Sequence, residues 1–344
     1  MQRVMARLGC VGGWGLGLAL LVLVLLWALG AGQFPLTPSQ VWQSLYAKVG
    51  GSASPLPGNA ETVLWNIRMP RIAAGMAVGA VLAAAGAAYQ GMFRNPLVSP
   101  DILGVSAGAG LGAVVGIFWG FSMAVVQLLA FAGGLAAVAV VVLISTSVRR
   151  HDPVLVLVLA GIALGALLGA GIALIKTLAD PNTQLPSITF WLMGGLSAVT
   201  LQDVGATVPV MLLALVPMAL LRWRINLLGL PDEEALSLGV SVRTLRLLLV
   251  ASATLGTAAA VSLAGIIGWV GLVVPHVARL LVGPNFVRLL PASVLLGAGF
   301  VVAADTLARS VARIELPLGI LTSLVGAPFF LYLLARTGRQ AGGQ

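Results

Sequence analysis

The sequence predicts an all-α protein that crosses a membrane about ten times. Hydrophobic residues make up 59% of the 344 residues and charged residues only 8%, with a mean hydropathy of +1.06. A soluble domain carries about 25% charged residues, so this composition excludes one. The apolar residues also gather into runs of roughly 20, the length that a helix needs to span a bilayer. We expect one membrane domain over residues 1–344.

The expected spans alternate with short polar connections. The first follows Arg3 and Arg7; a cleavable signal peptide is the alternative there, but the run is long enough to span and many more spans follow. Residues 33–66 are polar and rich in Pro, Gly and Ser, which predicts a loop outside the membrane. The ten expected spans are 14–32, 69–92, 101–120, 123–148, 153–178, 190–221, 244–264, 266–282, 289–308 and 317–335.

The basic residues set the expected orientation. Ten spans that start from a cytoplasmic N-terminus place both termini in the cytoplasm. Six basic residues then fall on the outer side: Lys48, Arg68, Arg71, Lys176, Arg309 and Arg313. The other 13 of the 19 lie inside, as the positive-inside rule requires. They are scattered between apolar runs rather than gathered on one face, which argues against nucleic-acid binding.

A short acidic segment between two spans is expected in the cytoplasm. Pro231 suits the first position of a helix, the next three carboxylates suit the positive end of its dipole, and Gly239 suits a left-handed terminator. This predicts a helix of about two turns, with Ser241 capping the next one. One interpretation is a solvated turn; the other is a docking helix for a soluble partner. The segment consists of Pro231, Asp232, Glu233, Glu234, Ala235, Leu236, Ser237, Leu238 and Gly239.

Glycine spacing hints at an internal repeat. Gly86, Pro96 and Gly104 are spaced by 10 and 8 residues, and Gly265, Pro275 and Gly283 repeat that spacing. The second span runs inward and the seventh outward, as in the inverted repeats of transporters. We therefore expect repeat halves at about 69–178 and 244–335. Glycines in the second and fifth spans indicate either tight helix packing or smooth walls along a wide pathway.

Ionisable groups inside the spans are scarce. Asp305 and Arg309 are four residues apart, which predicts a salt bridge near the outer surface. No second acid stands near midplane, and no phosphate-binding GxxxxGK[ST] loop occurs, so energy is expected from another chain. Cys10 is the only cysteine, and His151 and His276 are far apart. We expect no metal site and no cofactor in this chain.

Two polar clusters are candidates for contacts with partners. Arg68 and Arg71 share one helix face at the outer end, and Arg309 reaches the same side. Because this cluster runs against the bias that puts basic residues inside, a carboxylate-bearing partner is favoured over contact with lipid phosphates. Guanidinium groups bind carboxylates in a fixed two-pronged geometry. On the inner side, residues 94–101 interrupt the apolar pattern with two prolines. They form either a turn or the narrow inner mouth of a pathway.

Several motifs in one order resemble a known family. They are Ile67-Arg68-Met69-Pro70-Arg71, Gln90-Gly91-Met92-Phe93-Arg94-Asn95-Pro96-Leu97, Leu103-Gly104-Val105-Ser106-Ala107-Gly108, Ala264-Gly265-Ile266-Ile267-Gly268-Trp269-Val270-Gly271-Leu272-Val273-Val274-Pro275-His276 and Glu315-Leu316-Pro317-Leu318-Gly319. Over about residues 60–337 the chain resembles the FecCD-type permeases of bacterial ABC importers for iron complexes and vitamin B12. It departs from the commoner pattern in having Met69 where Leu is usual and in carrying the extra Arg313.

The resemblance implies a type II ABC importer architecture in the bacterial inner membrane. It implies a homodimer with the path on its two-fold axis and two ATPase subunits, which bind ATP and Mg, docked at Pro231–Gly239. A substrate-binding protein would dock outside on Arg68, Arg71, Arg309 and Arg313. The cytoplasmic gate would comprise Asn95, Pro96, Leu97, Asp152, Pro153 and Val154.

The function expected from the sequence is the permease subunit of an ATP-driven importer. Its cargo would be a large metal chelate: a ferric siderophore, haem or cobalamin. An ion-coupled secondary transporter is the alternative, disfavoured by the scarcity of midplane acids. A membrane scaffold without transport activity is a third, and it gives no reason for a structured acidic helix.

Overall fold

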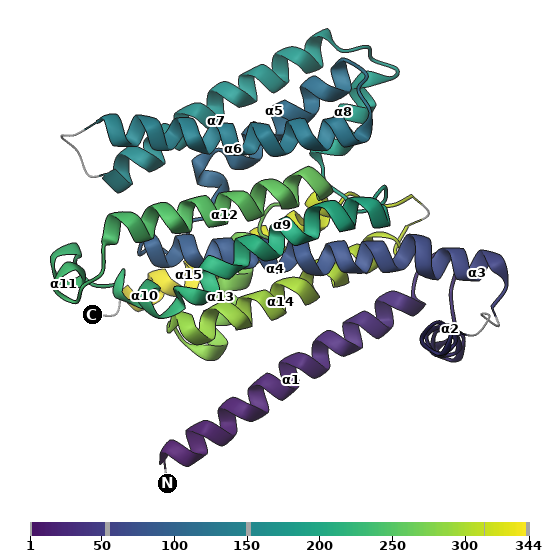
Figure 1. Ribbon diagram of the computed structural model, residues 1–344, viewed down its shortest axis with the longest axis horizontal. Helices are drawn as coiled ribbons and strands as arrows, with labels where there is room; N and C mark the ends of the chain where they lie inside the picture. The colour runs from purple at the N-terminus through teal and green to yellow at the C-terminus, as the bar shows by residue number, and fades with distance from the viewer. Residues whose placement is uncertain (1, 52–55, 149–152, 313, 342–344) are drawn as a thin grey trace.

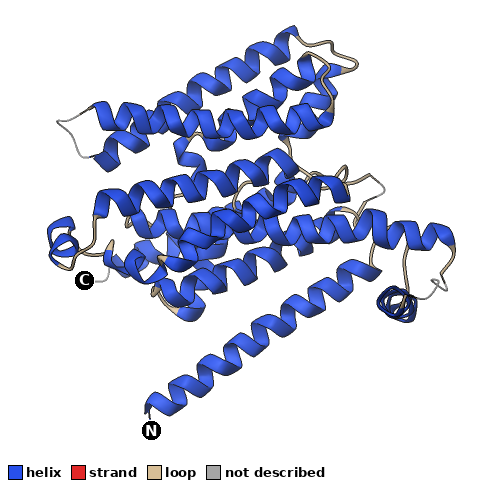
Figure 2. Cartoon of the chain, in the orientation of Figure 1, coloured by secondary structure: helices blue, strands red, loops and turns tan. Residues whose placement is uncertain are grey.

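A computed structural model describes residues 2–51, 56–148, 153–312 and 314–341, and this part of the chain is helical with no strand (Figure 2). The long apolar runs become helices because every backbone group must be satisfied within the bilayer. The helices are α1 (Gln2–Gly30), α2 (Pro38–Gly50), α3 (Gly58–Thr62), η1 (Val63–Arg68), α4 (Met69–Met92), η2 (Pro100–Leu103), α5 (Val105–Phe118), α6 (Met123–Ser147), α7 (Pro153–Leu178), α8 (Gln184–Leu192), α9 (Leu201–Leu220), α10 (Arg222–Leu227), α11 (Asp232–Ser237), α12 (Val242–Ala264), α13 (Val270–Val282), α14 (Phe286–Ala308) and α15 (Leu318–Ala341).

The helix inventory agrees with ten spans. Among the described residues, 7 helices are long and apolar enough to cross a membrane: α1, the continuous helix over 58–92, α6, α7, α9, α12 and α14. Three shorter apolar helices, α5, α13 and α15, bring the total to the expected ten. The span expected at 190–221 is wrong as one element, because the helix breaks between α8 and α9.

Helix α4 forms the core of the molecule and packs against α9, α12, α13 and α14 (Figure 1). Small residues bring these backbones together: a Cβ on Gly79 would lie 2.0 Å from the Gly297 carbonyl oxygen, and one on Gly86 would lie 1.8 Å from that of Gly271. Gly165 and Gly169 of α7 instead have nothing within 4 Å of such a Cβ. Gly79 and Gly86 therefore serve tight packing in α4, whereas Gly165 and Gly169 lie on an open face of α7.

Helices α5, α6, α7 and α8 form a separate layer beyond α12 (Figure 1, top). The successive helices α4, α5, α6 and α7 have 24, 14, 25 and 26 residues, and α12 to α15 have 23, 13, 23 and 24. The lengths follow the same order in the two predicted halves, and the repeat itself stays a prediction. The glycine spacing does not support it, because Gly86 lies inside α4 whereas Gly265 ends α12.

Three non-helical segments meet where α8, α12 and α15 approach one another. The Gly195 amide donates to the Ala264 carbonyl at 2.8 Å, and the Leu318 amide to the Gly194 carbonyl at 2.9 Å. Gly194 and Gly265 have φ angles of 71° and 67°, which favour glycine. Irregular backbone at membrane depth must be satisfied by protein, and these bonds do so.

The described residues of the segment 33–66 are largely helical, whereas their composition predicts a polar loop. They contain α2 and, from Gly58, the start of the long helix that continues into α4. Helix α2 begins with a reciprocal capping box, in which Thr37 and Gln40 satisfy each other's backbone amides. Gly51 ends it in the left-handed conformation, with φ 67°.

Candidate functional site

The acidic segment forms the predicted short helix at the inner end of the bundle. Pro231 is the residue before the helix rather than its first residue, so α11 spans only Asp232–Ser237. Gly239 has φ 79° and ends it as predicted. The Gly239 amide bonds to the Leu236 carbonyl at 2.9 Å and the Val240 amide to the Ala235 carbonyl at 3.1 Å, the pair of bonds that defines a Schellman end.

The sequence of α11 leaves one side anchored and the other side free. Ala235 is fully buried, so the helix rests on the bundle there. Glu233, Glu234, Leu236 and Leu238 are exposed. The exposed surface of α11 therefore combines two carboxylates with two leucines, a composition suited to contact with another protein. Ser241 stands at the N-cap position before α12, but its hydroxyl bonds to the Thr244 hydroxyl at 2.8 Å rather than to a backbone amide.

Arg94 joins α11 to the predicted gate loop, a link that the sequence did not reveal. Its Nε donates to the Leu228 carbonyl at 2.7 Å and an Nη to the Asp232 carboxylate at 3.1 Å; it also donates to the Leu230 carbonyl. Arg246 of α12 binds the same carboxylate through two bonds of 2.9 Å. Asp232 is thus shared by two guanidinium groups, which link α11 to the loop after α4 and to α12.

The predicted gate residues Asn95, Pro96 and Leu97 form an exposed turn directly after Arg94. The Asn95 side chain accepts a bond from the Leu97 amide at 2.9 Å, which fixes the turn without secondary structure. Asp152 lies outside the described residues, Pro153 begins α7, and Val154 lines a cleft on this side. The structure therefore places Val154 and the loop after α4 at the same inner end.

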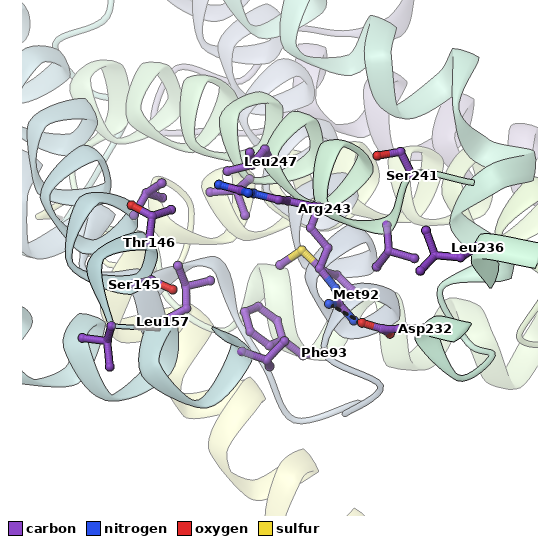
Figure 3. Close-up of a pocket in the computed structure, with 16 residues that line it drawn as sticks. Met92, Phe93, Ser145, Thr146, Leu157, Asp232, Leu236, Ser241, Arg243 and Leu247 are labelled. Carbon is purple, nitrogen blue, oxygen red and sulfur yellow. Dashed lines mark hydrogen bonds and ion pairs between the residues drawn. The ribbon is translucent and has the colours of Figure 1, made fainter. Parts of the chain in front are cut away.

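A cleft of about 770 Å³ lies between α6, α7, α11 and α12 (Figure 3). Asp232 and Leu236 of α11 lie on one side of it, and Ser145, Thr146 and Leu157 lie on the other (Figure 3). Phe93, the residue before Arg94, lines it as well. The cleft leaves room for α11 to move relative to α7.

The outer arginines that were predicted to dock a binding protein are buried where the structure describes them. Arg68, Arg71 and Arg309 are only 2%, 4% and 6% exposed, and Arg313 lies outside the described residues. Arg71 binds Asp305 through bonds of 2.8 and 3.3 Å and Glu315 at 2.8 Å. The predicted pair of Asp305 and Arg309 is confirmed, at 3.7 Å.

The other two guanidinium groups cap the outer end of α1. Arg68 donates to the carbonyls of Leu29, Gly30 and Phe34, and Arg309 to those of Ala28 and Ala31. The last carbonyls of a helix lack intrahelical partners and carry the negative end of its dipole, so cations are favoured there. Desolvation drives these arginines to partners inside the protein, which is why none of the three points outward.

Sequence reasoning missed Glu315 as a partner of Arg71, although it stands in one of the quoted motifs. An acid next to an apolar helix start is a signal that could have found it. Among the described residues, no three His, Cys, Asp or Glu side chains gather as a metal site would require.

Comparisons with known proteins agree on one family. The model of the FecCD transport family matches residues 20–336. The molybdate import system permease protein MolB of Haemophilus influenzae is 38% identical over 323 residues, 93% of this chain and 95% of that protein. The cobalamin import system permease protein BtuC of Halobacterium salinarum is 45% identical over 280 residues, 81% of this chain and 75% of that protein.

Two further matches concern haem transport and a solved structure. The hemin transport system permease protein HmuU of Yersinia pestis is 41% identical over 290 residues, 81% of this chain and 85% of that protein. A solved structure described as a metal-chelate type ABC transporter in an inward-facing conformation matches with a TM-score of 0.84 and 36% identity. That match covers 94% of this chain and 98% of the other.

Proposed function

Because this chain belongs to the FecCD transport family and is the permease of an ABC importer, we propose that its cargo is a metal chelate moved by alternating access. The chelate is a ferric siderophore, haem or cobalamin. Hydrolysis of ATP belongs to a separate subunit that binds ATP and Mg. The family excludes the alternative of an ion-coupled secondary transporter as the main activity.

The open face of α7 supports a large cargo. Leu159, Ile162 and Leu167 are exposed on it, and Gly165 and Gly169 leave smooth spaces between them. Between residues 154 and 175 this helix carries no charged side chain. A broad apolar wall suits a chelate whose metal is wrapped in organic ligand. A small oxyanion such as the molybdate named for one relative would gain few hydrogen bonds there.

A second copy of the chain is part of the proposal. Facing the open α7 face of one copy with that of its symmetry mate would enclose a path between the two copies. The bacterial inner membrane then holds the homodimer, with α11 and both termini in the cytoplasm. This orientation follows from the distribution of basic residues.

Helix α11 is proposed as the contact for the ATPase. The exposed Glu233, Glu234, Leu236 and Leu238 would bind a surface with basic and apolar groups. Replacing Gly239 by Ala strains a φ of 79° and should disturb the end of α11. Co-purification of the ATPase should fall for Gly239→Ala and stay unchanged for Gly205→Ala, a glycine in α9 with open space around it. Equal co-purification would argue against docking at α11.

The gate is proposed at Asn95, Pro96 and Leu97 together with Asp152, Pro153 and Val154. Cysteines placed at Asn95 in both copies, in a Cys10→Ser background, should crosslink to different extents with and without nucleotide. Equal crosslinking in all states would count against a moving gate at this turn.

The substrate-binding protein is proposed on the outer face. Docking through Arg68, Arg71 and Arg309 stays a prediction that no contact here supports, because their guanidinium groups point into the protein. A partner carboxylate would have to replace Glu315 on Arg71 before that residue could take part.

The cargo can be tested by uptake into proteoliposomes that contain the permease and ATPase, with binding protein added outside. Ferric siderophore, haem, cobalamin and molybdate are supplied separately, and an ATPase variant unable to hydrolyse ATP is the control. ATP-dependent accumulation of one chelate is expected. Accumulation of molybdate alone would overturn the chelate proposal while leaving the family assignment intact.

A further inference from the structure

Helix α2 lies across the direction of the spans. Figure 1 shows it nearly end-on, whereas α1, α4 and α14 run along the plane of the view. It stands at the end of the bundle opposite α11, beside the last turn of α1 and the start of the long helix over 58–92 (Figure 1). A helix crosswise at the end of a membrane bundle lies along the membrane surface rather than through it.

One face of α2 is fixed against the protein. Val41, Ser44 and Ala47 are buried, and they recur every third residue. The Trp65 indole donates to the Ser44 hydroxyl at 2.9 Å, and the Lys48 ammonium lies 5.4 Å from the centre of the Trp65 ring. With both ends capped as well, α2 is held in one rotation about its axis. Because these contacts fix the rotation of α2, its opposite face points away from the protein.

The outward face is apolar and aromatic. Trp42, Tyr46 and Val49 are 70%, 74% and 91% exposed. They stand at positions i, i+4 and i+7, which places them together on one side of a helix. No charged residue lies among them, because the only charge in α2 is Lys48, which is engaged with Trp65. A surface of this kind is costly in water.

We propose that this face binds membrane lipid, in the leaflet at the end of the bundle opposite α11. Trp and Tyr are the side chains enriched where headgroups meet acyl chains, and an amphipathic helix with such a face lies about 5–10 Å into that boundary. The surface is continuous with lipid-facing helix: Leu23, Leu26 and Trp27 of the adjoining α1 are also exposed. Helix α2 thus acts as a lateral anchor that fixes the depth of this end in the bilayer.

Absence of charge favours lipid over a soluble partner. A protein that binds and leaves in water needs a polar rim around its contact, whereas Trp42, Tyr46 and Val49 offer only the indole N–H and the phenol as polar atoms. Those two groups suit the ester and phosphate oxygens of lipid. The test must therefore distinguish lipid binding by this face from docking of a soluble protein on it.

Spin labels at single cysteines in a Cys10→Ser background test the proposal. Labels replace Trp42, Tyr46 or Val49 in the full chain reconstituted in phosphatidylglycerol–phosphatidylethanolamine vesicles. Gln43, exposed on the flank of the same helix, is the matched control. The three outward labels should be more accessible to oxygen, which partitions into lipid, than to a water-soluble nickel chelate. The label at Gln43 should show the reverse preference.

Two outcomes would overturn the proposal. In the first, the nickel chelate reaches all three outward labels as readily as it reaches the label at Gln43, which would mean that the face is in water. In the second, the three labels are protected from both reagents only when the binding protein is added, which would make α2 a docking surface. As a control, the thermal unfolding midpoint of each labelled variant is measured. Because all three positions are on the surface, the midpoints should equal that of the wild type.

Discussion

Arginines at the two ends of the bundle make similar bonds in opposite surroundings. At the outer end, the buried Arg71 binds the buried Asp305 and the partly exposed Glu315. At the inner end, Arg94 and Arg246 bind Asp232 where all three side chains reach solvent. Distances in both clusters are near 3 Å, so geometry does not distinguish them. Burial distinguishes them. The buried outer cluster stabilises the fold, whereas the exposed inner cluster makes contacts that can change.

The reason is desolvation. A buried charge that loses its partner stays out of water and unpaired, which costs about 3–5 kcal/mol. An exposed charge that loses its partner is solvated at once, and such pairs contribute about 0–1 kcal/mol. An arrangement that must break and re-form during transport has to belong to the second kind.

The largest effect is expected from removing the outer carboxylate. Asp305→Ala leaves Arg71 with Glu315 alone and Arg309 without an ion pair, so the free energy of unfolding should fall by about 3–5 kcal/mol. Denaturant titration in detergent micelles measures it. Arg288→Gln, an exposed arginine on the same helix α14, is the control and should change little. A loss of less than about 1 kcal/mol in the unfolding free energy of Asp305→Ala would contradict the conclusion that the outer cluster stabilises the fold.

A smaller loss is expected where α1 meets its capping arginines. Gly32 has φ 138°, and a Cβ there would lie 3.0 Å from Arg309 Nη1 and 3.1 Å from Arg68 Nη2. Gly32→Ala combines backbone strain with this crowding and should cost about 1–3 kcal/mol in the same titration. Gly15→Ala, in α1 with open space around it, should cost nothing. Equal stability of the two variants would show that the cap is not needed.

At the inner end, stability and activity should separate. Arg94→Gln loses an exposed ion pair, so its unfolding free energy should drop by no more than about 1 kcal/mol. The ratio of transported substrate to ATP hydrolysed in proteoliposomes should fall, because α11 and the gate turn are no longer joined. Arg288→Gln is again the control. An unchanged ratio would mean that Arg94 does not transmit motion.

The smallest effect concerns salt. The stability difference between wild type and Asp232→Asn should amount to a few tenths of a kcal/mol at low salt and shrink at high salt, because exposed pairs are screened. The difference for Asp305→Asn should stay nearly constant. Thermal midpoints at two salt concentrations measure both. Matching salt dependence at the two sites would remove the distinction between buried and exposed clusters.

The sequence predicted what local patterns encode. Apolar run lengths gave the ten spans, and the row of acids before Gly239 gave α11 with its left-handed end. The composition of residues 33–66 predicted a loop and so missed α2, although Thr37 and Gln40 form the capping-box pattern that marks its start. The direction in which a long side chain points could not be predicted from the sequence. Arg68 and Arg71 share a helix face, yet one turns to α1 and the other to α14, and those partners lie 39 and 234 residues away.

The cap on α1 has a consequence for the order in which the protein matures. Arg309 bonds to carbonyls that were synthesised 281 and 278 residues earlier. During translation the cap on α1 therefore forms in two stages. Arg68 can bond to the Leu29 and Gly30 carbonyls once the second span has been made, whereas the Ala28 and Ala31 carbonyls receive their arginine only with the ninth span. Completion of the outer end has to wait for the ninth span.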